Sequence, residues 1–212
     1  DELLGVLNKQ KGKIIVTSGP TYEEIDDVKV VTNKSSGKQG RALAIELSAR
    51  GYEIIYIHSA SIDHIPGLDN VSFHSSIDLK NKILENINNT DAIFMTAAVS
   101  DFTVKKSSGK ISRSNGNITL EFIPNEDIIA TIKSSYPEIK CIAFSAQVDD
   151  ELNFNKINTK NVDYLVINNI LKNNFGSDAN KVSIIDQQHL IFESEELDKN
   201  EISRDILNAL EY

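Results

Sequence analysis

The apolar residues of this chain fall into short continuous runs that alternate with helix-like patterns. In the first half the runs are Lys13–Ser18, Tyr52–Ser59 and Asp91–Ala98. Between them, Ser36–Arg50 and Asp78–Asn88 carry apolar residues at helical spacing. Near-continuous apolar strands that alternate with helices are typical of a parallel sheet covered on both faces. The pattern therefore predicts an α/β fold with a Rossmann-like, open, mostly parallel sheet.

The second half continues this alternation and then changes character. The predicted elements are, in order, a helix near 126–135, a strand at Lys140–Ala146, a helix near 150–160, a strand at Asp163–Asn168, a C-terminal β-hairpin of Val182–Asp186 and His189–Glu193, and a last helix at Glu195–Leu210. The spacing fits a single domain over residues 1–212.

The segment 102–123 does not fit the alternation. It carries Lys105, Lys106, Lys110 and Arg113, two glycines and then the alternating run ITLEFI, which predicts a strand. A compact α/β unit seldom needs so long a connection unless it has a function. We therefore expect 102–123 to leave the sheet as a lid, or as an arm that pairs with a second copy in a homodimer.

Composition narrows the function classes. The net charge is −9 and the pI is about 5.0, without a basic stripe, which argues against a nucleic acid partner but not against a nucleotide. The single cysteine, Cys141, lies in an apolar run, so we expect a buried, unreactive thiol. No apolar stretch approaches membrane-spanning length and no signal peptide is visible, so we expect a cytoplasmic protein without a membrane partner. Because the chain opens with Asp1, it can belong to a longer polypeptide.

Polar clusters follow the predicted strands at their carboxyl ends, where open α/β sheets bind ligands. These clusters are 17-TSGPTYEEID-26, 97-AAVSD-101, 144-FSAQ-147 and 168-NN-169, and the loop 33-NKSSGKQG-40 should lie at the same edge.

The loop 33–40 has two possible interpretations. Ser35 or Ser36 can cap the following helix through its hydroxyl group. Gly37 and Gly40 can let a ligand approach the backbone, and the helix dipole favours an anion there. By itself the loop favours a plain helix start over a phosphate site, because it is neither a Walker A motif nor a G-x-G-x-x-G fingerprint.

A series of motifs carries a resemblance to a known family. The motifs VTSGPTYEEID, VTNKSSGKQGRALA, TAAVSD, GKI, PNEDI, FSAQ, K-x3-K-N-x-D and FGSDAN occur in this order. The chain resembles phosphopantothenate–cysteine ligase, the phosphopantothenoylcysteine synthetase of coenzyme A biosynthesis. In many bacteria this enzyme is the second half of a protein that also contains a flavin-dependent decarboxylase.

The resemblance implies a reaction of 4′-phosphopantothenate, L-cysteine and CTP, assisted by Mg²⁺ that travels with the nucleotide and needs no dedicated metal site. Asn33 and Lys110 would be the catalytic residues. The substrate would contact Lys29, Asn33, Ala97, Ala98 and Asp101. The nucleotide would contact Ser35, Gly37, Gly40, Met95, Thr96, Ala97, Asp101, Lys110, Asn125, Glu126, Asp127, Ile128, Phe144, Lys156, Lys160 and Asn168.

The chain departs from the family pattern at three positions. Lys29 stands where the family often has arginine, so the charge is kept but the bidentate fork is lost. Glu126 replaces a proline and adds a negative charge near the expected nucleotide. The K-I-K motif reads K-I-S-R, so only Lys110 carries over.

Two alternative functions remain at this stage. The first is an NAD(P)-dependent oxidoreductase on a Rossmann-like sheet, which is disfavoured because no glycine-rich turn and helix directly follow the first strand. The second is a nucleotide-binding module without catalysis. Tyr136 and Lys140 have the Y-x3-K spacing of short-chain dehydrogenases, but Pro137 should keep them off a common helix face.

Overall fold

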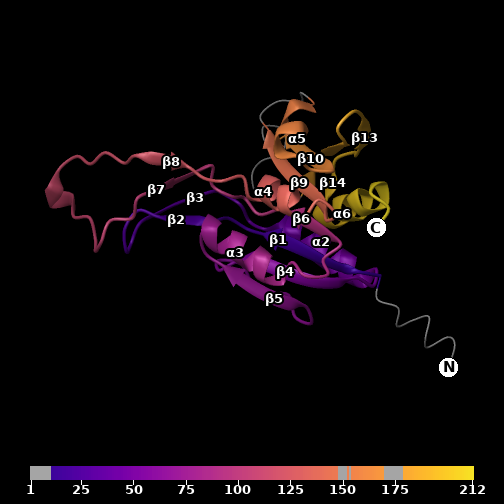
Figure 1. Ribbon diagram of the computed structural model, residues 1–212, viewed down its shortest axis with the longest axis horizontal. Helices are drawn as coiled ribbons and strands as arrows, with labels where there is room; N and C mark the ends of the chain where they lie inside the picture. The colour runs from indigo at the N-terminus through magenta and orange to yellow at the C-terminus, as the bar shows by residue number, and fades with distance from the viewer. Residues whose placement is uncertain (1–10, 148–151, 153, 170–178) are drawn as a thin grey trace.

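A computed structural model describes residues 11–147, 152, 154–169 and 179–212 (Figure 1). Its centre is an eight-stranded sheet. The strands are, in spatial order, β13 (Leu190–Glu193), β12 (Val182–Ile185), β10 (Tyr164–Asn169), β9 (Lys140–Gln147), β6 (Ala92–Met95), β1 (Lys13–Ser18), β4 (Glu53–Ser59) and β5 (Asp69–Phe73). The six strands from β10 to β5 are parallel, and the β12–β13 hairpin joins them antiparallel. The predicted fold class and C-terminal hairpin are confirmed.

Helices cover both faces of this sheet, as predicted. On one face α2 (Lys38–Ala49) and α6 (Lys199–Ala209) pack side by side on a core that includes Leu43, Leu47 and Ile206. On the other face, α3 (Ser76–Asn86), α4 (Ile128–Ser135) and α5 (Phe154–Lys160) bury a second cluster. Cys141 is fully buried in that cluster, and desolvation raises the pKa of its thiol to about 12, which confirms an unreactive cysteine.

The strand order places the ligand edge. Chain order runs outward from β1 to β4 and β5 on one side, and then from β6 to β9 and β10 on the other. The order therefore reverses between β1 and β6, the position at which open α/β sheets bind ligands. A parallel bridge between Pro20 and Ala98 extends the contact of these two strands beyond their carboxyl ends.

An arm projects from the sheet, as expected for 102–123 (Figure 1). It contains the antiparallel pair β7 (Phe102–Val104) and β8 (Phe122–Pro124), beside the hairpin of β2 (Tyr22–Glu24) and β3 (Val30–Thr32). The predicted strand over ITLEFI was wrong in position, because only its last two residues pair, together with Pro124. The reason is that Phe102, at the start of the arm, sets the register by pairing with Pro124.

Several short strands were missed. β5 is an edge strand with the sequence DNVSF, in which only Phe73 is fully buried, so it lacks the apolar run of its neighbours. The three-residue strands β2 and β3 and the two-residue pair β11 (Ala179–Asn180) and β14 (Leu197–Asp198) are too short for a periodic signal. In the part of the chain that the structure describes, no helix is both long and apolar enough to cross a membrane.

Candidate active site

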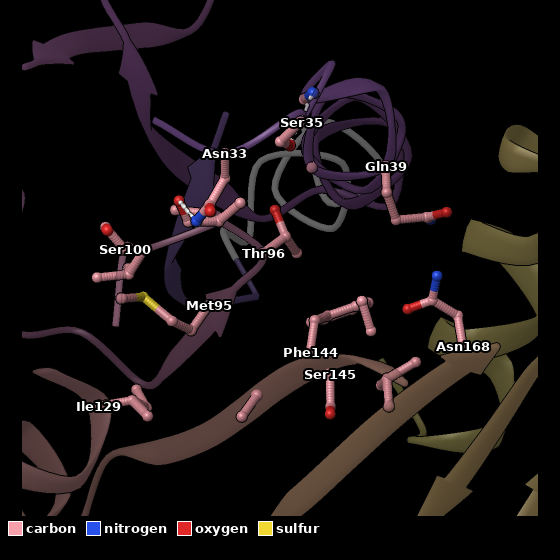
Figure 2. A pocket seen from close by; sticks show the side chains of 18 of the residues that line it. Asn33, Ser35, Gln39, Met95, Thr96, Ser100, Ile129, Phe144, Ser145 and Asn168 are labelled. Carbon is pink, nitrogen blue, oxygen red and sulfur yellow. Dashed lines mark hydrogen bonds between the residues drawn. The ribbon is translucent and has the colours of Figure 1, made fainter. Parts of the chain in front are cut away.

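A cleft of about 860 Å³ opens above the carboxyl ends of β6, β9 and β10 (Figure 2). Its floor is held by hydroxyl groups that tie β6 to the neighbouring strand β1. Thr17 Oγ1 accepts a hydrogen bond from the Ala97 backbone N–H at 3.1 Å, and Thr96 Oγ1 donates to the Thr17 carbonyl. These two hydroxyl groups therefore fix the point of the sheet at which the strand order reverses.

The loop 33–40 forms one wall of the cleft. Asn33 is exposed, and its Nδ2 donates to the Ala98 carbonyl at 3.1 Å, which ties the loop to the end of β6. Ser18 Oγ donates to the Gly37 carbonyl at 2.8 Å, which ties the loop to β1. Two strand ends thus hold the loop over the point at which the strand order reverses.

The predicted cap of α2 was wrong. The residue before the helix is Gly37, with a left-handed φ of 68°, and no side chain caps the helix. Ser35 Oγ only accepts a 3.4 Å hydrogen bond from the Gly37 N–H. The left-handed backbone moves the start of the helix past both serines, and such a backbone favours glycine.

The two glycines of the loop also have a packing role. A Cβ atom on Gly37 would overlap the side chain of Ile62, and a Cβ on Gly40 would lie 2.8 Å from Ser18 Cβ. Both positions are therefore small because α2 packs closely on the sheet edge. Close packing of the protein, rather than room for a ligand, explains why Gly40 carries no side chain.

The opposite wall comes from the start of α4 and from α5. Asn125 Nδ2 donates to the Ser100 carbonyl at 2.9 Å, and so holds the AAVSD segment in place. Asp127 caps α4 and forms an ion pair with Lys160 at 2.7 Å. Glu126 forms an ion pair with Lys80 at 2.6 Å, and this contact lowers the pKa of the Glu126 carboxyl. The extra negative charge noted in the sequence is thus compensated by a lysine on α3.

Lys156 lies deeper in the same wall and has an unusual environment. Its Nζ contacts Ser145 Oγ at 2.7 Å. Desolvation lowers the pKa of Lys156, and the charge of Lys160 lowers it further. A phosphate group at this point would relieve both effects, because an anion favours the charged ammonium.

Most of the residues predicted for the site come together at this cleft. They are Asn33, Ser35, Gly37, Gly40, Met95, Thr96, Ala97, Ala98, Asp101, Asn125, Glu126, Asp127, Ile128, Phe144, Lys156, Lys160 and Asn168. Figure 2 shows Asn33 on one side of the cleft, with Phe144 and Asn168 on another.

Lys29 and Lys110 do not line the cleft. Lys29 forms an ion pair with Asp26 and donates to the Ile111 carbonyl at 3.3 Å. Asp26 also accepts from the Ile111 backbone N–H at 2.9 Å, so the β2–β3 turn holds the chain next to Lys110. Within this chain, Lys29 and Lys110 therefore lie where the β2–β3 turn contacts the middle of the arm.

Some lining residues were missed by sequence reasoning. Gln39, Lys199 and Val182 line the cleft, and Asn180 was noticed only as part of the FGSDAN motif. The first four residues of that motif lie outside the described part of the chain. The available signal was weak, because Lys199 is 159 residues from Gly40 in the sequence and belongs to no quoted motif.

The charge in the cleft differs from that of the whole chain. Five lysines line it, at positions 34, 38, 156, 160 and 199, against the carboxylates of Asp101, Glu126 and Asp127. Two of these carboxylates already pair with lysines. An acidic chain of net charge −9 thus concentrates cations at one edge of its sheet, which suits a polyanionic ligand.

The family described as "DNA/pantothenate metabolism flavoprotein C-terminal domain" matches residues 9–212. The chain belongs to this family. This match confirms the resemblance found in the motifs, and a similar relative supports it. That relative, named coenzyme A biosynthesis bifunctional protein CoaBC, from Bacillus subtilis, is 32% identical over 93% of this chain and 50% of its own length.

Two further members show the extent of the match. A relative named cysteine/cysteine sulfinic acid decarboxylase, from an unknown prokaryotic organism, is 30% identical over 93% of this chain and 57% of its own length. The crystal structure of the C-terminal domain of a CoaBC protein matches with a TM-score of 0.74 and 28% identity, over 95% of this chain and 96% of the other. The chain thus spans about half the length of the curated relatives it matches.

Proposed function

We propose that this chain joins 4′-phosphopantothenate to L-cysteine at the expense of CTP. The products are phosphopantothenoylcysteine, CMP and pyrophosphate, and the intermediate is an acyl-cytidylate. One observation carries the proposal beyond family membership: Asn33, the AAVSD segment and Lys156 face one cleft at the reversal point of the sheet. An acid–amine ligase needs these parts together, because it must hold a carboxylate against a nucleotide phosphate.

In the first step, a carboxylate oxygen of phosphopantothenate attacks the α-phosphorus of CTP. A C–O–P bond forms, the bond between the α- and β-phosphates breaks, and pyrophosphate leaves. Asn33 Nδ2 is placed to donate to the reacting carboxylate group, since its present acceptor is the exposed rim of the cleft at Ala98. The first turn of α2 and Lys156 would bind the phosphates through their positive charge.

In the second step, the cysteine amine attacks the activated carbonyl carbon. A C–N bond forms, the C–O bond to CMP breaks, and the amine releases a proton. The chain's contribution is to hold the carbonyl still and to keep water out. The strand-to-strand hydroxyl bonds of Thr17 and Thr96 provide the rigid floor that this requires.

Mg²⁺ would bind through the phosphates of CTP and would neutralise part of their charge. Among the residues that the structure describes, no group of three or more His, Cys, Asp or Glu side chains could hold a metal. Protein ligands for Mg²⁺ are often only one or two carboxylates beside substrate phosphates. Asp101 would serve, because the other two carboxylates of the cleft, Glu126 and Asp127, pair with lysines.

We further propose that the arm pairs with a second copy in a homodimer. Its apolar side chains Phe102, Ile118, Phe122 and Ile123 are each about half exposed. Lys110 lies in the middle of this arm and outside the cleft of its own chain, so in the homodimer it would reach the cleft of the partner. Sedimentation at micromolar concentration tests this, and a strictly monomeric protein would contradict it. A decarboxylase partner, fused or separate, and a cytoplasmic location complete the proposal.

The direct test is a pyrophosphate assay. The protein is incubated with CTP, Mg²⁺, phosphopantothenate and cysteine, and the expected result is pyrophosphate release that requires phosphopantothenate. Release that does not depend on phosphopantothenate would refute the ligase. A comparison of CTP with ATP in the same assay decides the nucleotide. Nucleotide binding without turnover would favour the non-catalytic module, and an absorbance change of NAD(P)H would favour the oxidoreductase.

A further inference from the structure

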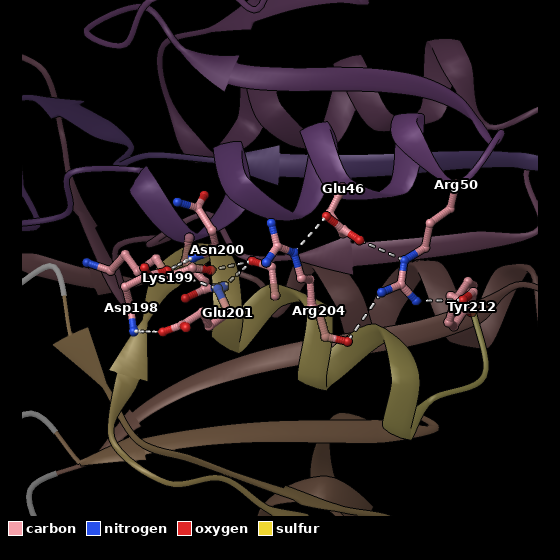
Figure 3. A network of polar contacts seen from close by, with 10 residues as sticks. Glu46, Arg50, Asp198, Lys199, Asn200, Glu201, Arg204 and Tyr212 are labelled. Carbon is pink, nitrogen blue, oxygen red and sulfur yellow. Dashed lines mark hydrogen bonds and ion pairs between the residues drawn. The ribbon is translucent and has the colours of Figure 1, made fainter.

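Helices α2 and α6 bring their N-termini together at the cleft. They run in the same direction, as Figure 3 shows. Near their starts, Gln39 Nε2 donates to Ser203 Oγ at 2.8 Å. Towards their ends, Arg50 donates to the Tyr212 carbonyl at 2.9 Å and contacts Glu46 at 3.0 Å. The two positive ends of the helix dipoles therefore point to the same edge of the sheet.

Both helices also begin with a lysine. Lys38 is the first residue of α2, and Lys199 is the first residue of α6. A cation at a helix N-terminus is electrostatically unfavourable, because carboxylates are the residues that the dipole stabilises there. α2 has no acidic residue in its first turn. Both lysines line the cleft, so each helix start adds a cation to it.

The backbone of Lys199 is held by a fixed chain of hydrogen bonds. Ser203 Oγ donates to the Lys199 carbonyl at 2.7 Å, so this hydroxyl must accept the bond from Gln39. On the other side, Asp198 and Glu201 form a complete capping box around the first turn of α6. Lys199 is thus built into the wall of the cleft, although it comes from the far end of the chain.

We propose that Lys199 binds the β- and γ-phosphates of the nucleotide and the pyrophosphate formed from them. This inference rests on the proposed function. If the carboxylate attacks from the side of Asn33, the leaving pyrophosphate must lie on the opposite side of the α-phosphorus, since displacement at phosphorus is in line. Figure 2 shows Asn33 on one side of the start of α2 and Gln39, a residue of that helix, on the other. Gln39 contacts α6 at Ser203, and Lys199 of α6 lines the same cleft, so the β- and γ-phosphates would extend towards that lysine. Gln39 and Ser203 act as positioning residues.

Calorimetry on the intact chain tests this with inorganic tripolyphosphate, CTP and CMP as probes. Lys199→Gln should weaken tripolyphosphate and CTP binding by about tenfold or more, the usual size of a lost charged hydrogen bond. CMP, which lacks the β- and γ-phosphates, should bind as before. Lys199→Arg should restore most of the affinity. The matched control is Lys181→Gln, which removes the same charge from a lysine that pairs with Glu193 outside the cleft.

Unchanged tripolyphosphate binding by Lys199→Gln would overturn the inference, and so would an equal loss of CMP binding. Retained CMP binding by the variant shows that it is folded, so a selective loss of tripolyphosphate binding is not a loss of fold. The two proposals fail separately. Tripolyphosphate binding that depends on Lys199, without pyrophosphate release, would support the phosphate site and refute the ligase activity. Normal turnover with a normal KM for CTP in Lys199→Gln would support the ligase activity and refute the phosphate site at Lys199.

Discussion

Replacing Asn33 by alanine should separate catalysis from folding. The structure gives Asn33 one side-chain hydrogen bond, 3.1 Å to the Ala98 carbonyl, on an exposed part of the loop. A typical hydrogen bond contributes about 0.5–1.5 kcal/mol, and water can replace this one, so the free energy of unfolding should fall by less than about 1 kcal/mol. For a chain of this length the melting temperature would fall by at most about 2–4 °C.

The effect on turnover should be far larger. Removal of one preorganised donor next to a reacting group typically lowers kcat about 10²–10³-fold. We therefore expect kcat/KM for phosphopantothenate in the pyrophosphate assay to fall by about two orders of magnitude or more in Asn33→Ala. Asn33→Asp should be at least as impaired, because a carboxylate in its place repels the substrate carboxylate.

The matched control is Asn86→Ala. Asn86 donates a similar amide hydrogen bond, 2.9 Å to the Lys82 carbonyl, but it lies on α3 outside the cleft. Its loss should leave kcat/KM unchanged. An Asn33→Ala enzyme with wild-type kcat/KM would refute the role of Asn33, and a fall in activity that matches a collapse of the melting temperature would show that the residue is structural.

Three other predictions follow from contacts described above. Gly40→Ala adds a Cβ only 2.8 Å from Ser18 Cβ, so α2 must move outward. We expect this overpacking to lower the free energy of unfolding by about 1–3 kcal/mol, offset by the roughly 1 kcal/mol by which alanine favours a helix. Thermal or urea unfolding measures the net change, and a more stable variant would contradict this packing. Asp26 is buried, and its contact with Lys29 holds the pKa of its carboxyl well below the ordinary value of about 3.9. Its stabilising effect is therefore present above about pH 4 and is lost as the pH falls further, so the stability difference between wild type and Asp26→Asn in urea titrations should shrink from pH 7 to pH 3. Because the pKa of Lys156 is lowered in the free protein, nucleotide binding should raise it, and calorimetry at alkaline pH in buffers of different ionisation enthalpy should show proton uptake that Lys156→Met abolishes.

The parallel part of the sheet could be predicted from sequence because its strands are buried on both faces. β1 and β4 read as continuous apolar runs, and the helices between strands follow a different period. The edge strand β5 has one exposed face and polar residues at Asp69 and Asn70, so the same criterion fails there. Pairings of two or three residues are set by tertiary contacts, which a local pattern does not contain.

The site was predictable as far as its residues lie in motifs at strand ends. The loop 33–40 meets the AAVSD segment because hydrogen bonds tie it to Ser18, at the end of β1, and to Ala98, just after the adjacent parallel strand β6. Sequence reasoning could not place Lys199, because α6 reaches the cleft only through its packing on α2. It also misassigned the cap of α2, because the left-handed conformation of Gly37 depends on the bond from Ser18 to the loop.

The hydrogen bond between Gln39 and Ser203 joins positions 164 residues apart. Contacts of such long sequence separation form late, because chain entropy opposes them. A growing polypeptide that has already folded β1, α2 and β4 therefore still lacks one wall of its cleft. The nucleotide can complete the domain only after α6 has docked, and at a hundred times its Kd it would then add about 2.7 kcal/mol to the stability.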